Sequence, residues 1–283
     1  MDDLETFLNI REMLVNFLQE DVGAGDITSN ELILPGVAAK GEIICKSESA
    51  VVCGLEEASM LFDICGCSSQ ILVDDGSKIS NGIAVLRICG DARAMLKAER
   101  TALNIIMRMS GVATETKRLV DLAKEVTILA TRKTSPGLRY FDKKAVVLGG
   151  GKTHRMRLDD MILIKDNHIS LVCDIEKCVS LAKRNKGASI AVECEARNEK
   201  DALTAILVGT DIVMLDNFPP SQVHETIKHI EKMGLRTRAK IEASGGINER
   251  NIEDYVRAKP DFISVGYITH SPKAIDFSLE IMK

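Results

Sequence analysis

Hydrophobic and polar residues change their spacing along this chain of 283 residues. The first part predicts a helix over residues 2–20 and then, up to about Lys97, short strands joined by turns of Gly, Asn and Asp. A long helical stretch follows, and from Val126 onward short apolar runs alternate with amphipathic helical segments. The runs are VTILA (126–130), MILI (161–164), SIAV (189–192), DIVML (211–215), AKIEA (239–243) and DFISVG (261–266).

Apolar runs that each precede a helix are typical of parallel strands buried on both faces. The pattern therefore predicts a parallel α/β fold for the second part of the chain. This part has about 175 residues, which is short for the ~250 of a complete eightfold barrel. An incomplete barrel and an open doubly wound sheet both fit the pattern.

Polar residues follow each apolar run at the same end. Because the carboxyl ends of parallel strands meet at one mouth, we expect these side chains to face one bowl. Cations there suit carboxylates, and glycine-rich turns suit phosphate because they present N–H groups. Glu195 and Asp216 could hold ribose hydroxyls, bind Mg²⁺ together with phosphates, or pair with the cations, and the sequence leaves these alternatives open. The cations are Arg132, Lys133, Arg155 and Lys165, and the turns are Gly149–Gly151 and Ser244–Gly246.

Charge is unevenly distributed along the chain. The formal net charge is −4, yet residues 132–165 hold nine Lys and Arg against three acids. Charge alone favours a solvated face for such a stretch, and we expect Lys143, Lys144 and Lys152 to be solvated.

The absence of Trp and the negative net charge argue against a nucleic-acid partner. No apolar run approaches the ~20 residues of a membrane span, and the acidic N-terminus is unlike a signal peptide, so a cytoplasmic protein is expected.

Two further features are predicted to be structural. The eight Cys residues include no C-x-x-C pair, so we expect small core residues rather than disulfides or a metal site. The segment Asp74-Asp75-Gly76 imitates an acidic ribose-binding loop, but it leads into more turn residues and is interpreted as a turn.

Nine short motifs follow one another along nearly the whole chain: GAGDITS (23–29), ERTALN (99–104), TRKTSPG (131–137), GGGKTHR (149–155), LIKDNH (163–168), VECE (192–195), MLDN (214–217), EASGGI (242–247) and ISVGYITHS (263–271). Together they resemble the quinolinate phosphoribosyltransferases, the carboxylating nicotinate-nucleotide pyrophosphorylases. The resemblance implies an N-terminal α/β sandwich domain over residues 1–108. It implies a seven-stranded, incomplete parallel α/β barrel over residues 109–283, whose last segment could pack back on the N-terminal domain.

The resemblance also implies a reaction and an assembly. The phosphoribosyl group of phosphoribosyl pyrophosphate would pass to quinolinate, giving nicotinate mononucleotide, CO₂ and pyrophosphate. Mg²⁺ would be required, and no organic cofactor. A homodimer with shared active sites is implied, and a hexamer of such dimers stays open.

Each matched residue carries an implied role, and Lys133, Glu195 and Asp216 would be catalytic. The implied set is Arg132, His154, Arg155, Lys165 and the partner's Arg100 for the quinolinate carboxylates, Lys133 for phosphoribosyl pyrophosphate, Glu195 and Asp216 for ribose and metal, and Ser244, Gly245, Gly246 and Gly266 for the phosphate, with His270 nearby. The chain departs from the family pattern in having Thr153 where Asn is usual and Arg157 where Gly is usual.

Three alternatives remain at the level of sequence. A related phosphoribosyltransferase could act on another pyridine or small carboxylic acid, although Lys165 favours quinolinate. A non-catalytic anion-binding protein could keep the same fold. A sugar-phosphate aldolase would need a Schiff-base lysine, and a Lys among Arg and His at a carboxylate site fits binding better.

Overall fold

The computed structural model describes residues 3–185, 187 and 189–282, and they fall into two compact units. The first unit takes in the chain up to Glu115, then residues 136–149, and then the chain from Pro272. The second unit takes in residues 116–135 and 150–271. The boundary expected between residues 108 and 109 falls inside one long helix, α4 (Ala92–Ala123).

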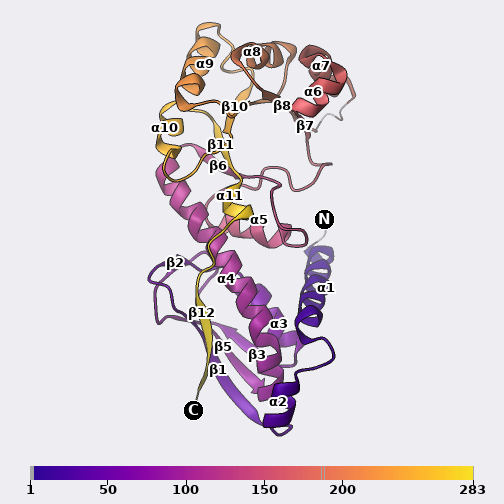
Figure 1. Ribbon diagram of the computed structural model, residues 1–283, viewed down its shortest axis with the longest axis vertical. Helices are drawn as coiled ribbons and strands as arrows, with labels where there is room; N and C mark the ends of the chain where they lie inside the picture. The colour runs from indigo at the N-terminus through magenta and orange to yellow at the C-terminus, as the bar shows by residue number, and fades with distance from the viewer. Residues whose placement is uncertain (1–2, 186, 188, 283) are drawn as a thin grey trace. The chain divides into compact units, whose positions relative to one another are not determined.

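The first unit is built on an antiparallel sheet with the strand order β12-β1-β5-β3 (Figure 1). The sheet joins parts of the chain that are far apart in sequence, since its edge strand β12, the last strand of the chain, pairs with β1 from Lys40 to Cys45. A second, two-stranded sheet is formed by β2 and β4. The elements are α1 (Asp3–Val22), α2 (Ile27–Leu32), β1 (Ala38–Cys45), β2 (Ala50–Val51), α3 (Leu55–Ile64), β3 (Ser68–Ile71), β4 (Lys78–Ile79), β5 (Ala84–Asp91), α5 (Arg139–Leu148) and β12 (Phe277–Met282).

Helix α5 is joined to the rest of the first unit by the ion pairs of Asp142 and Lys144. Arg108 donates from Nε and Nη2 to the two carboxylate oxygens of Asp142 at 2.8 and 3.0 Å, and the Asp142 side chain is fully buried. Lys144 donates to Glu56 and Glu57 at 2.6 and 2.7 Å. Lys143 is also fully buried.

The predicted solvation of Lys143 and Lys144 is therefore wrong, whereas Lys152 is exposed as expected. The counter-charges of Lys144 come from α3, about 90 residues earlier in the chain, so the local charge pattern did not reveal them.

The predicted turn is confirmed, and the prediction that the Cys residues are small core residues holds for five of the eight. All eight Cys are free, five of them are buried, and Cys173 is exposed. The acidic segment is a turn in which Ser77 N–H donates to Asp74 O at 3.1 Å and Asp75 accepts from Leu55 N–H at 3.1 Å.

The second unit is built on a parallel sheet with the strand order β6-β11-β10-β9-β8-β7. Helices follow the strands, and α7 packs against both α6 and α8 (Figure 1). This confirms the predicted α/β class. The elements are β6 (Thr127–Ala130), β7 (Ile162–Ile164), α6 (Asp166–Val172), α7 (Ile175–Asn185), β8 (Val192–Ala196), α8 (Glu199–Val208), β9 (Ile212–Asp216), α9 (Pro220–Lys232), β10 (Lys240–Ser244), α10 (Ile252–Arg257), β11 (Phe262–Val265) and α11 (Tyr267–His270).

Six parallel strands, rather than seven, are found in the described part of the second unit. The place of a further strand beside β6 is taken by a single parallel bridge between Leu129 and Lys152. Lys152 exchanges main-chain hydrogen bonds with Ile128 and Ala130, both at 2.9 Å. The chain cannot continue as a strand because His154, two residues later, has a φ of +50°, outside the extended region.

Strand β8 begins three residues later than the apolar run that predicted it. The run SIAV ends at Val192, where the strand begins, and the strand continues through Glu193 and Glu195. Both glutamates are buried. Hydrophobicity misplaced this strand because its inward positions carry acids, which need partners from elsewhere in the fold.

Among residues 3–185, 187 and 189–282, no helix combines the length and apolar character that crossing a bilayer requires.

Candidate active site

A cavity of about 550 Å³ lies in the second unit, where the carboxyl ends of the parallel strands meet. This is the mouth that the sequence predicted for the polar residues after each strand. The cavity is lined by Thr131, Arg132, Lys133, His154, Arg155, Leu163, Lys165, Asp166, Glu195, Met214, Asp216, Asn217, Glu242, Ser244, Gly245, Gly246 and Ser264.

One wall of the cavity is cationic. Arg132 and Lys133 follow β6, and Lys165 stands between β7 and α6. Arg155 is the last residue of the glycine-rich segment 149–155. Burial, together with the neighbouring Arg132, lowers the pKa of the Arg155 guanidinium. Nε of Arg132 is buried without a hydrogen-bond partner among the described residues. This wall therefore has donors and positive charge available to an anion.

Two carboxylates stand in the same cavity. Glu195, only 8 % exposed, forms an ion pair with Lys165. Asp216 ends β9, and its Oδ2 accepts from Nδ2 of Asn217 at 2.8 Å. Of the alternatives that the sequence left open, Glu195 therefore shows pairing with a cation, whereas Asp216 is held by an uncharged amide.

The turn after β10 is tightly packed against the end of β9. Gly245 and Gly246 have φ values of +100° and +64°. Asn217, itself at φ +59°, donates its N–H to Ser244 O at 2.8 Å. A Cβ on Gly245 would lie 2.2 Å from Asn217 Oδ1 and 2.8 Å from Asn217 Cα, so no residue other than glycine fits.

A second cavity of about 280 Å³ adjoins the first and shares this turn. It is also lined by Asn248, Gly266 and His270. Main-chain N–H groups in such turns, with glycines that leave room for close approach, suit a phosphate. A Cβ on Gly266 would lie 3.1 Å from Cδ of Lys133, which brings this lysine next to the second cavity.

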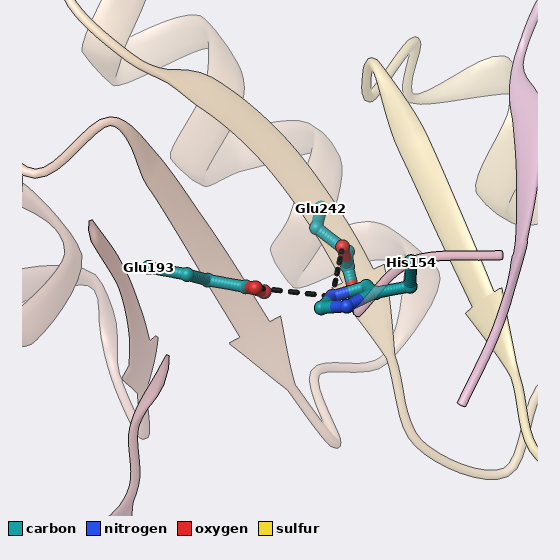
Figure 2. Close-up of side chains that lie close together, drawn as sticks. All are labelled: His154, Glu193 and Glu242. Atoms are coloured by element: carbon teal, nitrogen blue, oxygen red, sulfur yellow. Dashed lines mark ion pairs between the residues drawn. The ribbon is translucent and has the colours of Figure 1, made fainter. Parts of the chain in front are cut away.

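His154 sits between two buried acids (Figure 2). Its Nε2 lies 3.0 Å from Oε2 of Glu193 on β8 and 3.5 Å from Oε2 of Glu242 on β10. Its Nδ1 accepts the main-chain N–H of Arg155 at 2.7 Å. Glu193 and Glu242 are fully buried.

The ring and the two carboxylates lie close enough to interact electrostatically. Burial alone would lower the pKa of His154, but the two carboxylates outweigh it and raise that pKa. Burial raises the pKa of Glu193, against the opposing effect of His154. The N–H of Arg155 needs the lone pair of Nδ1 and therefore opposes a second proton on the ring.

Most of the predicted site residues are brought together. Arg100 lines neither cavity; it is exposed on α4 in the first unit. Gly266 and His270 line the smaller cavity. The ten that line the larger one are Arg132, Lys133, His154, Arg155, Lys165, Glu195, Asp216, Ser244, Gly245 and Gly246.

Sequence reasoning placed Glu193 and Asn217 after apolar runs but gave no role to them or to Glu242. The two glutamates lie inside apolar strands, and an acid within a buried run is a signal that could have identified them. Asn217 carries a weaker signal, because Asn after a strand is common in turns.

Comparison with known proteins identifies the family. The N-terminal domain of quinolinate phosphoribosyl transferase matches residues 26–110, and its C-terminal domain matches residues 112–280. A probable nicotinate-nucleotide pyrophosphorylase (carboxylating) of Methanocaldococcus jannaschii is 44% identical over 278 residues, which cover 96% of this chain and 97% of that protein. The Bacillus subtilis protein of the same name is 36% identical, covering 97% and 94%.

Solved structures agree with these matches. The nicotinate-nucleotide pyrophosphorylase of Francisella tularensis has a TM-score of 0.89 at 35% identity, covering 96% of each chain. NadC of Streptococcus pyogenes has a TM-score of 0.90 at 33% identity, covering 98% of each chain. The chain belongs to the quinolinate phosphoribosyl transferase family.

Proposed function

We propose that this chain transfers the 5-phosphoribosyl group of phosphoribosyl pyrophosphate to quinolinate with loss of CO₂. The products are nicotinate mononucleotide, CO₂ and pyrophosphate. The observation that carries the proposal is the cavity itself, in which Arg132, Arg155 and Lys165 form a cationic wall and Glu195 and Asp216 supply carboxylates. Such a cavity can hold a small acid with two carboxylates beside a ribose.

Quinolinate carries two adjacent carboxylates, and these need several fixed cations once water is excluded. The buried guanidinium of Arg155 and the unpartnered Nε of Arg132 are suited to this role. Lys165 is paired with Glu195 before substrate arrives. An incoming carboxylate can share this lysine, which leaves Glu195 available to the ribose.

Attack of the ring nitrogen on the ribose carbon passes through a cationic, oxocarbenium-like state. Glu195 and Asp216 favour that charge electrostatically. Departure of CO₂ breaks the bond between the ring carbon and its carboxylate and leaves the electron pair on that carbon. The cationic wall stabilises this charge until the carbon takes up a proton from solvent, which gives nicotinate mononucleotide. Ser244, Gly245, Gly246 and Gly266 bind the 5-phosphate with main-chain N–H groups, with His270 beside them, and Lys133 neutralises charge on phosphoribosyl pyrophosphate.

Mg²⁺ fits the donor set. Glu195 and Asp216 offer the hard oxygen ligands that this ion prefers, and a cavity of about 550 Å³ leaves room for the pyrophosphate, which would supply the remaining ligands. When bound, the ion neutralises charge on the leaving pyrophosphate.

The proposal includes a homodimer in the cytoplasm, in which Arg100 of one subunit completes the quinolinate pocket of the other. Its support is the family resemblance together with the exposure of Arg100 on α4. The number of dimers in the assembly is left open.

The proposal is tested by incubating the purified protein with phosphoribosyl pyrophosphate and Mg²⁺, with either quinolinate or nicotinate. Release of CO₂ and formation of nicotinate mononucleotide are measured. Turnover is expected with quinolinate only, and chelation of Mg²⁺ should abolish it reversibly. Equal turnover with nicotinate, or none with quinolinate, would favour a relative that acts on another acid.

Two lysines from the same basic stretch give a matched comparison. Lys165→Ala removes a cation of the cavity and should lower kcat/KM for quinolinate about 10- to 100-fold, as expected for the loss of a charge-assisted contact. Lys152→Ala removes an exposed charge outside the cavity and should leave kcat/KM unchanged. Equal losses of kcat/KM in the two variants would mean that activity depends on the net charge of the stretch and not on a specific cationic wall.

A further inference from the structure

We infer that His154 is a positioning residue for Arg155, held by Glu193 and Glu242, and that it is not itself a ligand of the substrate. The inference rests on the proposed function, since it assigns His154 a role within the quinolinate pocket. It departs from the role that the family resemblance implies for this histidine.

Both polar atoms of the His154 ring are already occupied. Nδ1 accepts the N–H of Arg155 at 2.7 Å, and Nε2 faces two carboxylates at 3.0 and 3.5 Å. The side chain is only 8 % exposed. A quinolinate carboxylate would have to displace one of these partners to reach a ring nitrogen. If the substrate displaced Glu193 or Glu242 from the ring, that glutamate would remain as a buried carboxylate without its counter-group, at a large cost in free energy.

The two glutamates have no comparable partner other than this ring. Both are fully buried, and none of their carboxylate oxygens has a hydrogen-bond partner among the described residues, so the contacts with Nε2 are ion pairs through Oε2. Glu193 and Glu242 come from β8 and β10, which flank β9 in the sheet. Figure 2 shows the two carboxylates approaching the ring from different strands. The ring is therefore anchored from two strands at once.

The loop that carries His154 is fixed at both of its ends. Lys152 is bonded to β6 through main-chain hydrogen bonds at 2.9 Å, and the N–H groups of Met156 and Arg157 donate to Asp160. Between these points the chain turns through the left-handed φ of His154. The next residue is Arg155, whose side chain lines the cavity. Anchoring the ring thus sets the direction in which Arg155 leaves the main chain.

The test separates the two ring contacts. His154→Asn keeps a side chain that tolerates positive φ and can still accept the N–H of Arg155, but it cannot reach the glutamates. Glu193→Gln removes the charge at the far end of the cluster, and Glu193 does not line the cavity. Both variants should raise KM for quinolinate about 10- to 100-fold, the size expected when a binding group is displaced by about 1 Å. KM for phosphoribosyl pyrophosphate should change less than twofold.

A double-mutant cycle decides between positioning and direct binding. If His154 acts through Arg155, adding His154→Asn to Arg155→Ala should raise KM for quinolinate no further than Arg155→Ala does alone. If the two effects multiply, His154 contacts the substrate independently and the inference is wrong.

A measurement without substrate keeps this result separate from the proposed function. Hydrogen exchange of the peptide that covers residues 149–157 should be faster in His154→Ala and Glu193→Gln than in the unmodified protein. His229→Asn is the matched control, because His229 pairs with Glu199 at 2.7 Å on the surface, outside the cavity. It should change neither exchange in this peptide nor KM. Unchanged exchange in Glu193→Gln would overturn the anchoring, whereas faster exchange in a protein inactive on quinolinate would refute only the proposed function.

Discussion

Gly245 and Gly246 give a sharp test of how the site is built. Both have positive φ, at +100° and +64°. A Cβ on Gly245 would lie 2.8 Å from Cα of Asn217, whereas a Cβ on Gly246 would meet no heavy atom within 4 Å. Replacing each by Ala therefore applies a similar backbone strain at two neighbouring positions, and only one of the replacements adds a collision.

The expected free energies follow from this difference. A side chain in the left-handed region costs about 1–2 kcal/mol, and both variants carry this cost. Gly245→Ala adds overpacking of about 1–3 kcal/mol. Asn217 cannot retreat freely, because its N–H is bonded to Ser244 O and its amide to Asp216, both at 2.8 Å. We therefore expect Gly245→Ala to lose about 2–5 kcal/mol and Gly246→Ala about 1–2 kcal/mol of unfolding free energy.

Thermal unfolding followed by circular dichroism measures the difference. At about 2–4 °C per kcal/mol for a domain of this size, the midpoint of Gly245→Ala should lie about 2–12 °C below that of Gly246→Ala. Gly245→Ala should also lose activity, since Asn217 orients the carboxylate of Asp216. Equal midpoints for the two variants would refute the reasoning, because Asn217 would then give way without cost.

Two other predictions follow from the charges. Asp261 accepts from Ile241 N–H and Lys240 and pairs with Arg236, at 2.8–2.9 Å, and these contacts outweigh burial and lower its pKa from 3.8. Because the folded pKa lies below the unfolded one, this stabilisation is present above pH 3.8 and is lost as the pH falls through the folded pKa. Asp261→Asn should therefore lower the unfolding free energy, measured by urea denaturation at pH 7, by about 1–2 kcal/mol. The difference between the variant and the unmodified protein should be smaller below pH 3.8, and a difference independent of pH would contradict this. For the proposed dimer, mixing inactive Arg100→Ala and Lys133→Ala proteins should restore partial activity through hybrid dimers; no recovery, with subunit exchange demonstrated, would place Arg100 outside the partner's pocket.

The sequence by itself determined the parallel α/β class of the second unit and most of the cavity wall. Six apolar runs predicted six parallel strands. Residues after the first five line the larger cavity, and Gly266 and His270 after the sixth line the smaller cavity beside it. The physical reason is that parallel strands with helical crossovers all present their carboxyl ends at one edge. Once the strands are recognised, the loops that form the site follow from their order along the chain.

Only the tertiary structure decided which charges inside the protein meet. Lys144 finds Glu56 and Glu57, and His154 finds Glu193 and Glu242, across separations of about 40 to 90 residues. The spacing of residues along a strand shows which side chains share a face, but it does not show which loop folds over that face. A buried charge is tolerable only beside its partner, so the partner is part of the fold and cannot be inferred from the local pattern.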